Sequence, residues 1–211
     1  ERVFGSKLSR YFAANFNVKD SGLPSGSDER CIISSPRIQQ ILGFTDSVWV
    51  FIDIKSAGPR DDFEHAVMSP YQVSGSGGWQ NIPDGVMNSP IIAQGRRASH
   101  DFLCSLPPIY VLSDGTVAPL VTIVIKPIYS MMFNNNQNIG QPLQKIKIAS
   151  IPNGLLLTQN PNYLETYPNL FFPGKDDKGK DLRKIRARIS FDILRNINQW
   201  RVAEIEVPNH A

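Results

Sequence analysis

The clearest alternation of apolar and polar residues lies near the end of the chain, over residues 185–193. Every second position of this stretch is apolar and the positions between are mostly polar, the pattern of a strand that is buried on one face. A second alternating stretch follows over 203–207, after a connection through Asn196 that offers a turn. We therefore predict a C-terminal β-hairpin over about 185–207.

The register of this predicted hairpin accounts for its charges. With the turn centred near Asn196, Arg188 faces Glu204 and Arg186 faces Glu206. Opposite charges at facing positions stabilise an antiparallel pair of strands. On this prediction both arginines are used inside the hairpin.

Apolar runs rich in β-branched residues predict further strands. Asp114-Gly115 follows one such run and predicts a tight hairpin turn at that point. Its return strand is almost wholly apolar and is expected to be central in a sheet. The strands predicted in this way cover residues 48–54, 109–112, 120–125 and 145–151.

Two short helices are predicted before the strands. Ser35 can cap a helix that begins at Pro36 and stops at Gly43. An N-terminal amphipathic helix is predicted over about 3–16, because its apolar residues recur at helical spacing. We expect this helix to pack on a sheet; the alternative is that it swaps onto a neighbouring subunit or touches a membrane surface. The residues for such self-association are Phe4, Leu8, Tyr11 and Phe12.

Together these elements predict one β-rich domain over residues 1–211. The favoured architecture is an antiparallel sandwich or barrel with a few short helices, and the alternative is an α+β sheet. The chain holds 16 prolines and 15 glycines spread along its length, which suits many short strands joined by turns. The long turn-rich region over 55–105 is either functional surface or conceals further strands.

Charge and cysteine content narrow the classes only slightly. A net charge of +3 does not by itself require an anionic partner. Cys31 and Cys104 are too few for a disulfide scaffold, and buried free thiols are the favoured interpretation. The sequence shows no signal peptide and no apolar run that spans a bilayer, so we expect a cytoplasmic or virion-associated protein.

Candidate catalytic residues are few. Ser99-His100-Asp101 contains the residue types of a catalytic triad, but members of a triad converge from distant segments. The Asp61–His65 stretch has the spacing of neither a calcium loop nor a helical metalloprotease site. Cys104 has no evident orienting partner for a thiolate. We therefore predict no catalytic residues, no metal, no cofactor and no small-molecule substrate.

A basic stretch before residue 185 is the main charge-biased feature. Nearby aspartates cancel part of its charge, leaving about two positive charges, worth about 2 kcal/mol near an anionic membrane. Contacts this weak matter only when many copies act together. The candidate residues for binding an anionic surface or a nucleic acid are Lys175, Lys178, Lys180, Arg183 and Lys184, with Arg96 and Arg97 as an extension.

The predicted function is a non-enzymatic assembly protein that forms homo-oligomers, of the kind used as viral matrix or capsid subunits. A β-rich nucleic-acid-binding domain that uses the basic stretch is the first alternative. An enzyme that uses Cys104, His100 or the Asp61–His65 stretch is the second.

Overall fold

The fold is that of a computed structural model of the 211-residue chain. The structure describes residues 2–21, 27–58, 61–75, 91–94, 99–102, 104, 106–134, 137–154, 165–173 and 185–208. Within these ranges the fold is mainly β, with a mixed sheet and a few short helices, which confirms the predicted class. None of the described helices is long and apolar enough to cross a membrane.

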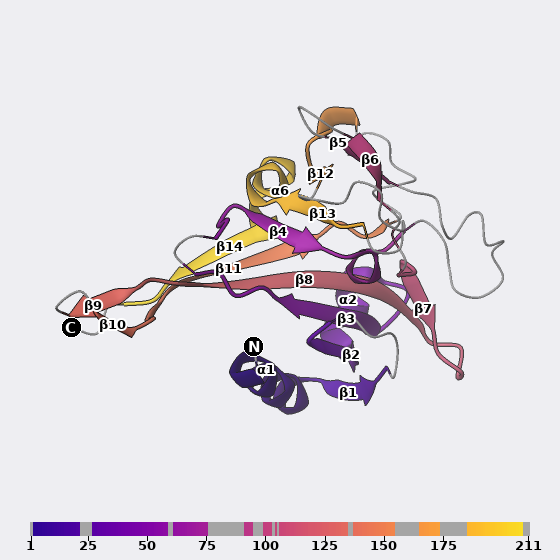
Figure 1. The fold of residues 1–211 in the computed structure, drawn as a ribbon. Coiled ribbons are helices and arrows are strands. Elements are labelled where there is room, and N and C mark those ends of the chain that lie inside the picture. The colour runs from indigo at the N-terminus through magenta and orange to yellow at the C-terminus, as the bar shows by residue number, and fades with distance from the viewer. Residues whose placement is uncertain are drawn as a thin grey trace.

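A large sheet forms the centre of the molecule (Figure 1). Its strands run in the order β1-β2-β3-β8-β11-β14, and β7 pairs with one end of β8. β3 and β8 are parallel, and the other neighbouring strands are antiparallel. The strands of this sheet are β1 (Asn17–Asp20), β2 (Glu29–Ser34), β3 (Ser47–Ile54), β7 (Ile109–Val111), β8 (Val117–Tyr129), β11 (Leu143–Ile151) and β14 (Val202–Glu206).

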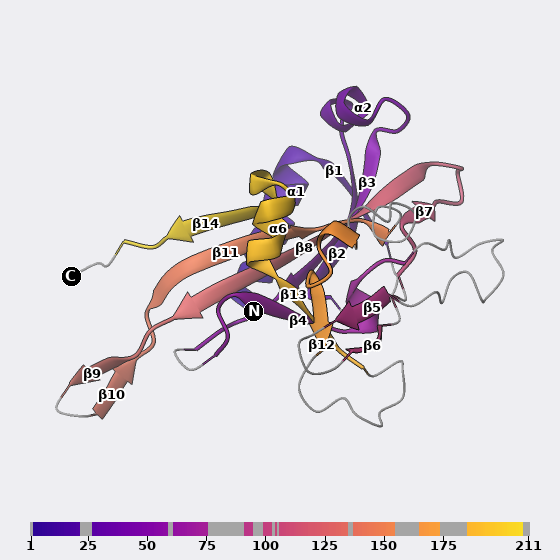
Figure 2. The same cartoon turned by 90° about the horizontal axis from the view of Figure 1, so that it is seen from above.

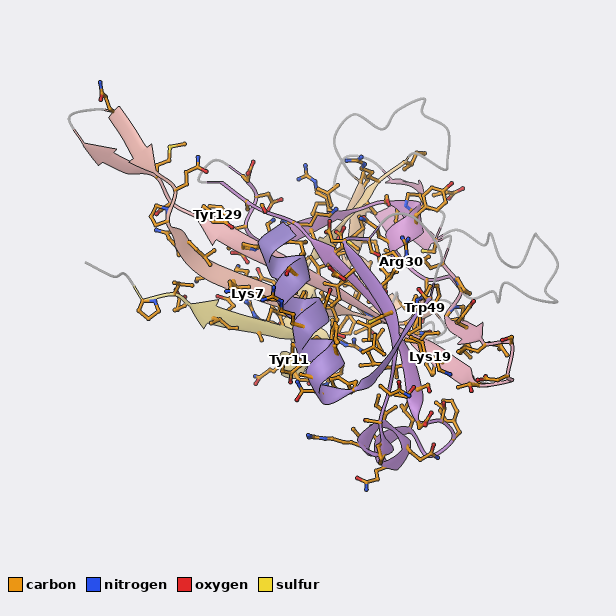
Figure 3. The ribbon with its side chains drawn as sticks, turned by 90° about the horizontal axis from the view of Figure 1, so that it is seen from below. Lys7, Tyr11, Lys19, Arg30, Trp49 and Tyr129 are labelled. Atoms are coloured by element: carbon orange, nitrogen blue, oxygen red, sulfur yellow. The ribbon has the colours of Figure 1, made fainter. Side chains whose placement is uncertain are left out.

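The helix α1 (Arg2–Asn15) covers one face of this sheet. Its Leu8 and Phe12 pack with Phe16 against buried residues of β3, Val50 and Ile52 among them. Figure 3 looks onto this face, with α1 lying across the strands and with Lys7 and Tyr11 on the helix. The helix predicted over 3–16 is therefore present and packs on a sheet, as expected.

The opposite face carries a second layer (Figures 1 and 2). A three-stranded sheet in the order β12-β13-β4 lies there, followed by the helix α6 (Phe191–Ile197) and the turn η3 (Gln199–Arg201). The main core lies between the layers and combines Val124 and Ala149 of the large sheet with Ile189, Phe191 and other buried residues. The strands of this layer are β4 (His65–Met68), β12 (Phe171–Pro173) and β13 (Ala187–Ser190), with β5 (Ile91–Gln94) and β6 (Ser99–Phe102) paired beside them.

An arm extends from one end of the large sheet. β8 and β11 are joined through a small hairpin of β9 (Met132–Asn134) and β10 (Gln137–Gly140). In both views this hairpin lies beyond the body of the molecule (Figures 1 and 2).

Several sequence predictions are confirmed. The helix α2 (Pro36–Leu42) begins after Ser35, whose side chain accepts a hydrogen bond from the Ile38 amide, and ends at Gly43 with a φ of 78°. β7 and β8 form the hairpin predicted at Asp114-Gly115, where Gly115 has a φ of 84°. β8 is central between β3 and β11, as its apolar composition indicated.

The predicted C-terminal hairpin is wrong. The chain enters α6 directly after β13, because the Ser190 side chain caps this helix. Phe191 and Leu194 are the buried residues of α6. β13 then pairs with β4, whereas β14 pairs with β11 in the large sheet.

The predicted cross-strand ion pairs are wrong for the same reason. Arg188 lies 3.4 Å from Asp62, and Glu204 lies 3.2 Å from Lys145. Glu206 also pairs with Lys145, at 2.8 Å.

Candidate active site

Two charged residues interrupt the otherwise apolar strand β3 at its end. Strand alternation places Asp53 with Trp49 and Phe51, on the face opposite α1, and Lys55 continues this alternation just beyond the strand. The amide of Lys55 donates to the Ile125 carbonyl at 2.8 Å, which continues the parallel pairing of β3 and β8. Both side chains therefore project from a rigid, central part of the sheet.

A second carboxylate lies across from Asp53. The β2–β3 register pairs Glu29 with Ile52, so that one further step places Asp28 opposite Asp53. The Asp28 amide donates to the Ile52 carbonyl at 3.0 Å, and the Ile54 amide donates to Asp28 Oδ2 at 2.6 Å. This extended register makes Asp28 and Asp53 neighbouring carboxylates at the same end of β2 and β3.

Asp53 is held by two neighbours although only 3% of its surface is exposed. Lys55 Nζ lies 2.7 Å from Asp53 Oδ2, and Gln72 Nε2 donates to Asp53 Oδ1 at 2.6 Å. A buried carboxylate is costly without a cation and hydrogen-bond donors, and both are present here. Asp28, by contrast, is exposed.

The side of Lys55 opens into a cleft of about 670 Å³. Lys126 on β8 also lines it, next to Lys55 in the extended parallel register of β3 and β8. Lys147 follows on β11 directly opposite Lys126, so that three lysines form a row across the sheet. The cleft is lined by Lys55, Ser56, Ala57, Asp61, Asp62, His65, Val67, Lys126 and Arg188.

Buried lysines fix the outer wall of the cleft. Lys126 donates to the carbonyl oxygens of Asp62 and His65, and Lys147 donates to Glu64 Oε1 at 2.6 Å. Burial lowers the pKa of Lys126, and the nearby carboxylates only partly offset this effect. These hydrogen bonds therefore connect the turn before β4 to strands β8 and β11 of the large sheet.

Asp62 and His65 form an ion pair within this wall, with His65 Nδ1 at 2.8 Å from Asp62 Oδ2. Partial burial, the largest single effect, raises the pKa of Asp62. The hydrogen bonds from His65 and the Glu64 amide, with the attraction of His65 and Lys126, outweigh it and lower the pKa overall. Asp62 thus remains a carboxylate facing the cleft.

The site has the donor set of a divalent-cation centre of the magnesium type. Mg²⁺ is commonly held by one or two carboxylates together with water and a substrate phosphate. Asp28 and Asp53 supply hard oxygen ligands from two adjoining strands, so that their chemistry fits such an ion. Within the described ranges no cluster of three or more His, Cys, Asp or Glu side chains has metal-binding geometry.

The predicted anion-binding residues lie outside the residues that the structure describes. This applies to all five of Lys175–Lys184 and to Arg96 and Arg97. Of the predicted self-association residues, Leu8 and Phe12 pack against the core under α1, whereas Tyr11 is 58% exposed. The side chain of Phe4 is outside the described part.

The three catalytic candidates considered from the sequence lie in different surroundings. Ser99, His100 and Asp101 are consecutive in β6, and the side chains of Ser99 and His100 lie outside the part of the chain that the structure describes. Cys104 is fully buried, and burial raises its thiol pKa far above the usual range, which keeps it unreactive. The Asp61–His65 stretch, by contrast, lines the cleft.

Sequence reasoning missed Asp28, Asp53, Lys55 and Gln72. The available signal was an aspartate followed two positions later by a lysine, at the end of a strand that is otherwise apolar. A charged residue in a buried strand is seldom structural alone, and it was a stronger candidate than the histidines.

The comparisons with known proteins agree on one family. The family model described as restriction endonuclease BglI matches residues 1–205. The type II restriction enzyme BglI of Bacillus subtilis is 46% identical over 212 residues, which cover 98% of this chain and 71% of that enzyme.

Two solved structures share the fold. The crystal structure of the restriction endonuclease BglI bound to its DNA recognition sequence matches with a TM-score of 0.89 and 46% identity. The match covers 98% of this chain and 70% of that one. Tetrameric restriction endonuclease SfiI bound to cognate DNA matches with a TM-score of 0.64 over 99% of this chain and 71% of that one. At 15% identity this second match shows the fold alone.

These findings overturn the predicted function. A non-enzymatic assembly protein of the viral matrix or capsid type is wrong, because the family that matches consists of DNA-cleaving enzymes. The error arose because the acidic pair is completed only when β2 and β3 come together. The chain belongs to the restriction endonuclease BglI family.

Proposed function

We propose that this chain is a DNA endonuclease that hydrolyses a phosphodiester bond at the site formed by Asp28, Asp53 and Lys55. The observation that carries the proposal is the meeting of two carboxylates on adjoining strands with the Lys55 ammonium 2.7 Å from one of them. Family membership supports the same chemistry.

The cation that Asp28 and Asp53 would hold supplies Lewis-acid polarisation of the phosphate and lowers the pKa of the attacking water. Water adds to phosphorus, the bond from phosphorus to one sugar oxygen breaks, and that oxygen leaves with a proton. The role of the two aspartates is to hold the positive charge of the cation next to the reacting phosphate. Because β2 and β3 are hydrogen-bonded neighbours, the pair needs little reorganisation before reaction.

Lys55 supplies positive charge where negative charge develops on the phosphate oxygens. Its side chain is 31% exposed and lies between buried Asp53 and the cleft. A lysine acts as a point charge toward phosphate, and its ion pair with Asp53 restricts its position before substrate binds.

The test is cleavage of plasmid DNA in the presence of Mg²⁺. Removing one charged side chain that stabilises the transition state of phosphoryl transfer lowers the rate on the order of a hundredfold or more. D53N and K55M are therefore expected to lose at least about 99% of the cleavage rate, and chelation of Mg²⁺ with EDTA is expected to abolish it.

D114N and K19M are the matched controls. Asp114 and Lys19 form an exposed ion pair at 3.5 Å, away from the cleft residues. Both control variants should cleave at the unchanged rate. Full activity of D53N, or equal losses in D53N and D114N, would show that the reaction does not use this site.

The partner that follows from this proposal is duplex DNA in place of a membrane. We also propose that the basic residues between 175 and 184, with Arg96 and Arg97, contact its phosphates. Arg188, which follows this stretch in the sequence, lines the cleft, and this supports the proposal.

A further inference from the structure

The amide of Gln72 is fixed in one orientation beside the acidic pair. Gln72 ends the turn η1 (Pro70–Gln72) and is 6% exposed. The Ser69 amide donates to Gln72 Oε1 at 2.8 Å, while Gln72 Nε2 donates to Asp53 Oδ1 at 2.6 Å. Since a backbone N–H can only donate, the oxygen of the amide must face Ser69 and its NH₂ group must face Asp53.

The segment after Gln72 is held from two other parts of the chain. Leu106 exchanges backbone hydrogen bonds with it, accepting from Gly75 at 2.8 Å and donating to Val73 at 3.2 Å. The Gly154 amide donates to Ser74 Oγ at 2.6 Å. A β-carbon on Gly154 would collide with the Ser74 and Gly75 carbonyl oxygens, so that only glycine permits this approach. Gln72 thus stands on a rigid support.

The two donors to Asp53 differ in kind. Lys55 is a basic residue that is partly exposed and lines the cleft, where under the proposed function a substrate phosphate would compete with Asp53 for it. Gln72 is neutral and buried, and its contact with Oδ1 does not depend on substrate. This donor restrains the Asp53 carboxylate about its last torsion, also when Lys55 turns to a substrate phosphate.

We infer that Gln72 is a positioning residue, which fixes the Asp53 carboxylate in the orientation that binds the divalent cation. The inference rests on the proposed function, because it assigns Gln72 a role at that same site. Residues that orient a metal ligand commonly change metal affinity or activity by about 10-fold to 100-fold when they are replaced.

Two variants separate this role from the contact with Ser69. Q72E keeps an acceptor for the Ser69 amide and puts a second carboxyl group in place of the amide donor to Asp53, so that the two acids repel each other unless they share a proton. Q72M keeps most of the volume and removes both hydrogen bonds. We expect both variants to bind Mg²⁺ at least about tenfold more weakly in calorimetric titration of the DNA-free protein. In cleavage assays kcat should fall, while KM for DNA should stay within about twofold.

Q40E is the matched control, because Gln40 is an exposed residue of α2. It should bind Mg²⁺ with unchanged affinity. Q72E with the affinity and kcat of the unchanged protein would overturn the inference, since its bond to Ser69 alone would then suffice. Thermal unfolding checks that each variant folds; if Q72E and Q72M both fail, Q72N, whose shorter amide falls short of Asp53, carries the same expectation.

The design also distinguishes this inference from the proposed function. If the unchanged protein binds no Mg²⁺ and D53N cleaves DNA normally, the proposed function fails and the inference fails with it. If the unchanged protein binds Mg²⁺ and D53N is inactive while Q72E and Q72M behave as the unchanged protein, only the role of Gln72 is refuted.

Discussion

The buried carboxylate of Asp53 is held in place by neighbouring side chains. Asp53 occupies a strand position that would suit valine or isoleucine, and the contacts of Lys55 and Gln72 with its two oxygens offset the cost of burying a carboxylate there. Removing either neighbour leaves a buried carboxylate less compensated, a large cost compared with that of an exposed ion pair. Residues of the site are thus expected to affect both stability and activity.

Asp62 provides a pH test of the cleft wall. Its lowered pKa means that the folded chain keeps this carboxylate charged at a lower pH than the unfolded chain does. Its contribution to the free energy of unfolding is therefore full above the unfolded pKa of about 3.9 and is lost as the pH falls through the folded value. We expect D62N to be less stable than the unchanged protein at pH 6 and equally stable near pH 2.

The effect should be no more than about 1 kcal/mol, since the Asp62 side chain is 38% exposed and solvent screens its ion pair. Urea unfolding at the two pH values measures it. D101N, at an exposed aspartate of β6, is the control and should show no such difference. A D62N destabilisation that is the same at both pH values would contradict the assignment.

Sequence reasoning at this scale succeeded with local chemistry and failed with chemistry made by pairing. Ser35 and Gly43 were recognised as helix ends because capping depends on neighbours within a few residues. Asp28 and Asp53 lie 25 positions apart in the sequence and become neighbours only through the β2–β3 register. The sequence alone does not display that register.

At the scale of elements, the C-terminal region shows how one pattern serves two structures. Ile185, Ala187 and Ile189 are buried in the strand pattern, as alternation predicted. Phe191 and Leu194 are spaced three apart and are buried by a helix instead. The change from strand to helix occurs at Ser190, because its side chain accepts a hydrogen bond from the Ile193 amide and caps α6.

The basic segment before β13 is the element whose predicted role is most directly measurable. DNA affinity falls with salt in proportion to the number of phosphate contacts, with a log–log slope of about −0.9 for each. If Lys178 and Lys180 each contact one phosphate, K178A/K180A should make this slope shallower by about 2 and should weaken binding to all sequences alike. Fluorescence anisotropy with labelled duplex over a salt series measures both quantities.

K7A/K19A is the control for this measurement. Lys7 lies on α1, which covers the face of the sheet away from the cleft (Figure 3). Lys19 lies on β1, where it pairs with Asp114 at 3.5 Å, and it does not line the cleft. This pair should leave the slope unchanged. Equal slopes for K178A/K180A and the unchanged protein would remove the segment from the DNA interface.

For the whole molecule, the two faces of the large sheet have separate tasks. α1 closes one face with apolar contacts from Leu8 and Phe12, and Asp53 and Lys55 project from the other face, where the cleft lies. The mainly β class was predictable because composition and alternation report burial. The layer order was not, because β3 and β8 pair in parallel across 62 intervening residues, from Lys55 to Thr116.

Self-association, the other property predicted from sequence, now has a chemical reason. The described part of one chain holds a single Asp28–Asp53–Lys55 cluster, whereas a DNA duplex has two strands of opposite direction. Two clusters related by a two-fold axis match that symmetry, so that a dimer with one site for each strand is expected. Tyr11, exposed on α1, stays a candidate for the contact between the copies.

We therefore expect light scattering of the DNA complex to show two chains of 23.6 kDa per duplex. Cleavage of supercoiled plasmid should then yield linear DNA with little accumulation of nicked circles, because both strands are cut in one binding event. Y11S should lower the dimer fraction if α1 forms the contact, whereas Y71S, at an exposed tyrosine of η1, should leave it unchanged. A complex with one chain per duplex that releases nicked circles would refute the dimer, while leaving the chemistry of the single site intact.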